Sequence, residues 1–173
     1  MTEFVADTSG LVSLGIAAGR EPDPLRICLD EYRVLLPETV VEELHEIASY
    51  DDQHGRAATA VLDRTDDVAV RSVSLDEDFP LDDGENAAVT LANERNAALF
   101  CCDEFTHLGL IHASLANTRL VTTPTTLSVL VRTNRLSADD ALAVLETIEA
   151  ARSWDSNSYV QRARSLLEDD ESP

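Results

Sequence analysis

The chain has 173 residues, and its 33 Asp or Glu against 13 basic residues give a formal net charge of -20 and a pI of about 4.3. This length suits a single domain with one sizeable hydrophobic core. A hydrophobic share of 44% excludes a disordered chain, and the acidic balance excludes the usual basic surface of nucleic-acid-binding proteins.

All 13 basic residues are arginine, and the chain contains no lysine. Carboxylates hold water and cations well, whereas the long lysine stem exposes apolar surface. At roughly 1 M salt the Debye length is about 3 Å, so the self-repulsion of an acidic protein is largely screened. The composition therefore predicts a halophilic source, such as a halophilic archaeon, and the alternative is an ordinary acidic protein.

The three cysteines, Cys28, Cys101 and Cys102, are too few and too irregularly spaced for a disulfide framework or a zinc ribbon. The N-terminal sequence MTEFVADTSG lacks the charged and apolar regions of a signal peptide. No apolar stretch is long enough to span a membrane. We therefore expect a cytoplasmic protein.

Short apolar runs alternate with longer segments of helical periodicity along the chain. The runs predict strands at residues 3–7, 33–36, 68–73, 99–102 and 119–122. The periodic segments predict helices at 9–18, 23–31, 38–50, 56–64, 84–95, 105–116 and 125–132. This alternation predicts an α/β fold, a three-layer α/β/α sandwich with a central parallel sheet.

Two further helices follow with no strand between them, one from Ser137 to about residue 151 and one from Ser156 or Asn157 to about residue 167. We interpret them as an appended helical hairpin over residues 135–168, packed on a domain formed by residues 1–134. The acidic residues 169–173 are expected to form a flexible tail.

Four acids are candidates for one site. Asp7 and Asp103 end predicted strands, and the carboxyl ends of parallel strands meet at one edge of the sheet. Glu43, within VVEEL, and Glu85, within DDGEN, lie on helices that can reach that edge. Converging carboxylates repel one another unless a cation neutralises them, and oxygen ligands select Mg²⁺ or Mn²⁺. Gly84 would let backbone approach a ligand closely. The alternative, in a chain with 33 acids, is that each is a solvated surface residue.

Four segments, VADTSGL, PETVVEEL, LDDGENAAVTLA and LFCCDEFTHL, resemble the motifs of the PIN-domain family. The stretch TRLVTTPTTLSVLVRTNRLSADDALAVLETI resembles the ending of prokaryotic, VapC-toxin-like members. The resemblance implies that Asp7, Glu43, Glu85 and Asp103 are the catalytic and metal-binding acids, with Glu42 as the other register of the second motif. The sequence departs from the family at Cys101, where threonine is usual, and at Glu104, where a basic or polar residue is usual.

The resemblance also implies a function, an endoribonuclease that uses Mg²⁺ or Mn²⁺. Such a protein would be a homodimer, and an antitoxin protein would be its partner if it is the toxin of a toxin–antitoxin pair. Thr8, Ser9 and Thr106 would position water or phosphate, and ordinary helix capping is the alternative role for these hydroxyls. The competing functions are a non-catalytic binding or regulatory module, a housekeeping RNA-processing enzyme and a DNA-directed nuclease.

Overall fold

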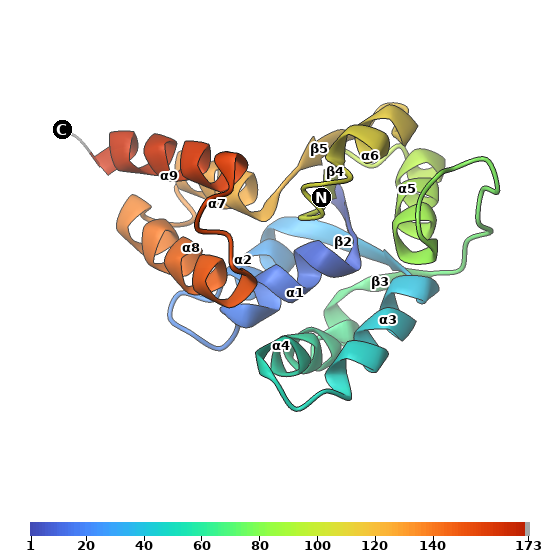
Figure 1. Ribbon diagram of the computed structural model, residues 1–173, viewed down its shortest axis with the longest axis horizontal. Coiled ribbons are helices and arrows are strands. Elements are labelled where there is room, and N and C mark those ends of the chain that lie inside the picture. The colour runs from blue at the N-terminus through green and yellow to red at the C-terminus, as the bar shows by residue number, and fades with distance from the viewer. Residues whose placement is uncertain (172–173) are drawn as a thin grey trace.

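The computed structural model describes residues 1–171 and contains a five-stranded, all-parallel sheet in the order β3-β2-β1-β4-β5 (Figure 1). The strands are β1 (Thr2–Ala6), β2 (Tyr32–Pro37), β3 (Ala69–Arg71), β4 (Leu99–Cys101) and β5 (Arg119–Val121). Each predicted strand is present, so the predicted α/β/α sandwich is confirmed.

Helices connect all the strands in the described part of the chain. They are α1 (Thr8–Ile16), α2 (Pro24–Glu31), α3 (Glu38–Ala48), α4 (Gln53–Leu62), α5 (Asp83–Arg95), α6 (Leu108–Ser114), α7 (Thr123–Arg132), α8 (Ala138–Arg152) and α9 (Ser158–Glu171), with a 3₁₀ turn at Thr65–Asp67. The predicted helices are confirmed, with ends that differ by a few residues. Within residues 1–171, none of these helices has the length and apolar character needed to cross a bilayer.

Strand β1 lies at the centre of the sheet and pairs with β2 on one side and with β4 on the other. Phe4 is in register with Val34 of β2 and with Leu99 of β4. Val5 and Phe100 are completely buried. A parallel sheet covered by helices on both faces needs such continuously apolar strands, which explains why the strand segments show no polar alternation.

The order of the strands places the helices in two layers. The chain moves from β1 to β2 and β3 in one direction, and from β3 to β4 and β5 in the other. Because crossover connections are right-handed, α1 to α4 lie on one face, and α5 and α6 lie on the opposite face. Helix α5 packs across β1, β2 and β4. The direction reverses beside β1, where the loops after β1 and β4 diverge, and such a switch point is where α/β sheets bind ligands.

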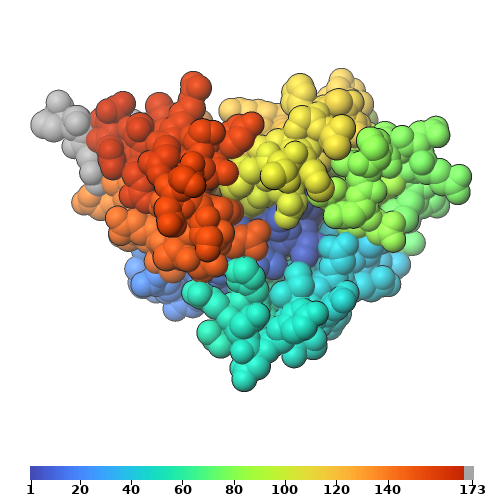
Figure 2. All heavy atoms as spheres, viewed as in Figure 1, coloured from blue at the N-terminus to red at the C-terminus, as the bar shows by residue number. Residues whose placement is uncertain are grey.

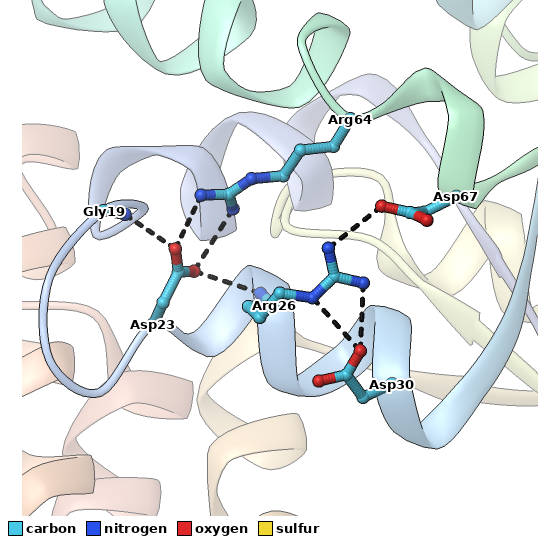
Figure 3. Close-up of polar contacts among 6 residues, drawn as sticks. All are labelled: Gly19, Asp23, Arg26, Asp30, Arg64 and Asp67. Atoms are coloured by element: carbon cyan, nitrogen blue, oxygen red, sulfur yellow. Dashed lines mark hydrogen bonds and ion pairs between the residues drawn. The ribbon is translucent and has the colours of Figure 1, made fainter.

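An ion-pair network fixes α2 against the chain that follows α4 (Figure 3). The Asp23 carboxylate caps α2 and accepts two hydrogen bonds from the Arg64 guanidinium, at 2.7 and 3.3 Å. Arg26 donates to Asp30, one turn along α2, and to Asp67 in the 3₁₀ turn. These contacts join α2 to the segment after α4, and they involve none of the four candidate acids.

The predicted helical hairpin corresponds to α8 and α9, which pack on each other and on α7. Asn157 caps α9, because its side-chain oxygen accepts from the amides of Tyr159 and Val160. Trp154, between the two helices, is buried. Helix α9 continues to Glu171, so residues 169–171 are helical, unlike the expected tail, since no Gly or Pro before Pro173 would end the helix. Residues 172–173 of that tail lie outside the described residues.

Candidate functional site

A cavity of about 420 Å³ opens beside the carboxyl ends of the central strands. In Figure 2 the N-terminal segment, in dark blue, lies at the bottom of a recess between the segments coloured orange, yellow and teal. Six carboxylates and one guanidinium, that of Arg152, are on its wall. The lining residues are Asp7, Thr8, Ser9, Val12, Glu43, Ile47, Tyr50, Asp52, His54, Asp82, Glu85, Glu104 and Arg152. We call this space the acidic cavity.

Asp7 follows β1 directly and caps α1. Its Oδ1 accepts hydrogen bonds from the Gly10 amide at 3.0 Å and from the Ser9 hydroxyl at 2.7 Å. Only 2% of the residue is exposed, and no arginine pairs with it within the described chain. Burial raises the pKa of Asp7 from 3.8 to about 7, against the hydrogen bonds that lower it. The carboxylate therefore lies in the cavity wall without an ion-pair partner among the described residues.

Glu43 reaches the cavity from the middle of α3. Its Oε2 accepts a 2.5 Å hydrogen bond from the Thr8 hydroxyl at the start of α1. Partial burial raises the pKa of Glu43, the Thr8 hydrogen bond lowers it, and the nearby Asp82 and Glu85 raise it again. The adjacent Glu42 is exposed and is absent from the cavity wall. The geometry thus favours Glu43 in the second motif.

Gly84 was expected to let a ligand approach the backbone closely, but the Glu43 carboxylate occupies the space beside it. A Cβ added at Gly84 would overlap with both carboxylate oxygens of Glu43. The space that we expected a ligand to occupy is filled by this side chain, because α3 and α5 pack together at the carboxyl edge of the sheet.

Glu85 lies in the first turn of α5 and is 4% exposed. It forms a capping box with Asp82: the Glu85 amide donates to Asp82, and the Asp82 amide donates to Glu85 Oε2 at 3.3 Å. Its Oε1 lies 3.0 Å from Nδ1 of His107. The pKa of His107 is raised by this hydrogen bond and by the charge of Glu85.

Asp103 follows β4, but its carboxylate faces β5 and is absent from the lining of the acidic cavity. Oδ1 accepts from the Thr123 amide at 2.7 Å, and Oδ2 accepts from the Thr123 hydroxyl at 2.5 Å. Burial raises the pKa of Asp103 against these hydrogen bonds. Its amide donates to the Ser9 hydroxyl at 2.9 Å, which connects it to Asp7. The structure thus brings Asp7, Glu43 and Glu85 into the lining of the acidic cavity, and Asp103 is connected to this lining through Ser9.

The three hydroxyls expected to position water or phosphate have different surroundings. Thr8 and Ser9 line the acidic cavity, and each already donates its proton to a carboxylate, Glu43 and Asp7 respectively. They retain acceptor lone pairs, so they suit a donor such as water better than a phosphate oxygen. Thr106 is exposed in the turn before α6 and is absent from the cavity wall.

Sequence reasoning did not assign roles to Glu104, His107 and Arg152. One ligand atom from each of Glu85, Glu104 and His107 lies within 4.8 Å of the others, so these three can hold a metal ion together. The Glu-x-x-His spacing of residues 104 and 107 is a sequence signal from which this group could have been found. Arg152 ends α8, with its guanidinium 5.8 Å from the centre of the Trp154 ring. No sequence signal connects it to acids far earlier in the chain.

The donor set of the acidic cavity fits a hard divalent cation. Asp7 and Glu85 are nearly fully buried, Glu43 is half-buried, and all three offer carboxylate oxygens to the same space. The raised pKa of Asp7 reflects negative charge that burial disfavours, which a bound cation would offset. Three carboxylate ligands suit Mg²⁺ or Mn²⁺. His107, beside Glu85, would add a nitrogen ligand, which Mn²⁺ accepts more readily than Mg²⁺ does.

These features define an α/β protein with an acidic site at the switch point of a parallel sheet. A family model for the PIN domain matches residues 3–169, so the chain belongs to the PIN-domain family and has a nuclease fold. No curated protein matches the chain. All three cysteines are free and buried.

Proposed function

We propose that this protein is a divalent-metal-dependent endoribonuclease that hydrolyses phosphodiester bonds in the acidic cavity. The observation that carries the proposal is the convergence of Asp7, Glu43 and Glu85, from three separate segments, on one cavity wall. Mg²⁺ or Mn²⁺ held by these carboxylates, with Asp103 directly or through water, would activate water and neutralise charge on the phosphate.

The residues of the chain have separate roles in this proposal. Thr8 and Ser9 orient Glu43 and Asp7 through the hydrogen bonds that they donate. Arg152 is the one arginine among the described residues of the cavity wall, so it is the group that contacts the phosphate of the substrate. Glu104 and His107 extend the set of metal-binding groups beside Glu85.

The test is cleavage of a labelled RNA with added Mn²⁺ by Asp7→Asn, Glu43→Gln and Asp103→Asn variants. Glu42→Gln is the matched control for Glu43→Gln, since it removes the same charge from the neighbouring, exposed position of α3. We expect the three site variants to lose activity and the control to retain it. Undiminished cleavage by both aspartate variants would contradict the proposal. Cleavage of DNA in place of RNA would show that the protein is a DNA-directed nuclease.

The arrangement of Asp103 favours one other candidate, a non-catalytic binding module. Both of its carboxylate oxygens accept hydrogen bonds from Thr123, which leaves the cavity with three of the four expected acids. Calorimetric titration with Mn²⁺ discriminates between the two. Measurable binding that Asp7→Asn abolishes supports the nuclease, whereas a folded protein that binds no Mn²⁺ supports the module.

A toxin role, an antitoxin and a homodimer remain part of the proposal. Six carboxylates on one cavity wall complement a basic peptide, which is the chemistry an antitoxin segment would need. A small reading frame beside the gene, whose product inhibits cleavage, would support the toxin role, and its absence would favour housekeeping RNA processing. Light scattering would test the dimer.

A further inference from the structure

A second cavity, of about 390 Å³, has the opposite electrostatic character. Three arginines, two hydroxyls and one tyrosine line it, and the described lining residues include no carboxylate. They are Arg119, Thr125, Ser128, Arg132, Tyr159, Arg162, Ala163 and Leu166. We call it the arginine pocket. In a chain of net charge -20 with 13 arginines, three in one pocket is a strong local excess of positive charge.

The pocket is assembled from three elements, of which β5 and α7 follow each other in the sequence and α9 comes later, after α8. Arg119 begins β5, and Arg132 ends α7. Thr125, Ser128 and Arg132 follow one face of α7 at helical spacing. Tyr159, Arg162, Ala163 and Leu166 do the same on α9, which packs on α7. The cations therefore converge because two helix faces and a strand end meet.

The three arginines of the pocket have no carboxylate partner among the described side chains, unlike six of the ten other arginines. Six arginines elsewhere form ion pairs: Arg26, Arg33, Arg64, Arg95, Arg135 and Arg164. Among the described side chains, neither Arg119, Arg132 nor Arg162 lies within ion-pair distance of a carboxylate. An acidic protein that keeps three guanidiniums apart from its own acids leaves them available to an external anion.

The remaining lining groups suit a nucleic-acid strand. Tyr159 and Leu166 are each 52% exposed, so an aromatic face and an apolar surface lie beside the guanidiniums. The Thr125 hydroxyl accepts from Thr122, which leaves its own proton for a phosphate oxygen. An aromatic ring for a base next to donors for phosphates is the combination that single-stranded nucleic acids require.

A row of aromatic rings connects the arginine pocket to the acidic cavity. The Tyr159 ring stacks on Phe105 with 5.6 Å between centroids, and Phe105 meets Trp154 edge-on at 5.1 Å. Arg152, on the wall of the acidic cavity, lies over Trp154. Contacting side chains thus join the arginine pocket, through Tyr159, to Arg152 on the wall of the acidic cavity.

We propose that the arginine pocket binds the phosphodiester backbone of single-stranded RNA, as a second contact for the strand that is cut in the acidic cavity. The proposal rests on the proposed function, since that function makes RNA the strand in question. Its test is a binding measurement that needs no cleavage, so the RNA-binding proposal and the proposed nuclease function can fail separately.

The experiment is fluorescence anisotropy with a labelled single-stranded RNA and the full chain, in chelator, over a series of salt concentrations. The test variant combines Arg119→Gln, Arg132→Gln and Arg162→Gln. The control combines Arg33→Gln, Arg56→Gln and Arg71→Gln, which removes the same charge from three other exposed positions. We expect the slope of log affinity against log salt to become shallower by about 2 in the test variant. Each lost contact with a phosphate of a single strand reduces this slope by about 0.7, and the variant loses three.

The control should keep the slope of the unmodified protein. Equal slopes and affinities in the two variants would overturn the proposal, as would a mononucleotide that binds as tightly as the RNA. Unchanged RNA binding with loss of self-association in light scattering would make the pocket a protein interface and overturn it as well. If the test variant fails to fold, Arg162→Gln alone should lower the slope by about 0.7.

Discussion

Gly84 lies against the carboxylate of Glu43, and this contact joins the start of α5 to the middle of α3. A Cβ at position 84 would overlap with both oxygens of that carboxylate. Position 84 has a helical conformation that alanine adopts readily, so the requirement for glycine comes from the neighbouring side chain and not from the backbone.

Gly84→Ala should therefore displace the Glu43 carboxylate and weaken Mn²⁺ binding by about 10-fold to 100-fold, as misplaced metal ligands do. Calorimetric titration measures this. Gly109→Ala, in α6, is the matched control because no atom lies within 4 Å of an added Cβ there. Equal Mn²⁺ affinity in the two variants would show that Glu43 does not bind the metal.

Thr8→Val should raise the pKa of Glu43 further, because the Thr8 hydroxyl donates the hydrogen bond that lowers it. The variant should then bind Mn²⁺ more weakly at acidic pH and recover as the pH rises. Thr106→Val, at an exposed turn position, should keep the pH dependence of the unmodified protein. Titrations at several pH values would detect the difference, and parallel curves would contradict it.

The free energy of unfolding without divalent cations should fall as pH rises from about 3.8 to about 7. Over this range folded Asp7 holds a proton that the unfolded chain releases, so each pH unit costs at most about 1.4 kcal/mol. Denaturant unfolding across the range measures the slope, and Asp7→Asn should flatten it. Asp103 and Glu43, whose pKa values are also raised, contribute in the same direction, and Glu3 and Asp23, whose pKa values are lowered, contribute in the opposite direction.

Arg152→Ala should raise KM for RNA by about 10-fold, the usual effect of losing a hydrogen bond to a charged group, and Arg152→Lys should recover part of the loss. Arg135→Ala, which removes an exposed arginine paired with Glu31, is the control. Steady-state cleavage kinetics give both constants. A KM for Arg152→Ala equal to that of the control would exclude the phosphate contact.

The sequence was sufficient for the elements of the fold because buried parallel strands are continuous apolar runs and the helices carry clear periodicity. It also indicated Asp7, Glu43 and Glu85, since each belongs to a local motif near a strand end. It did not indicate that Thr123 binds the Asp103 carboxylate, which depends on the pairing of β4 with β5.

The two cavities could not be predicted from the sequence either, because they too depend on contacts between separate elements. Arg152 and Glu104 meet at the acidic cavity only through the packing of the C-terminal hairpin. The arginine pocket depends on the packing of α7 on α9, and arginines at 119, 132 and 162 share no spacing that a single element would reveal.

The Ser9 hydroxyl donates to Asp7 and accepts from the Asp103 amide, so it holds together the loops that follow β1 and β4. Both bonds join groups of the chain to each other. The separation between the two strand ends is thus set when the chain folds, and a ligand that arrives there has little backbone left to order. A preorganised site of this kind retains more of its contact energy as affinity.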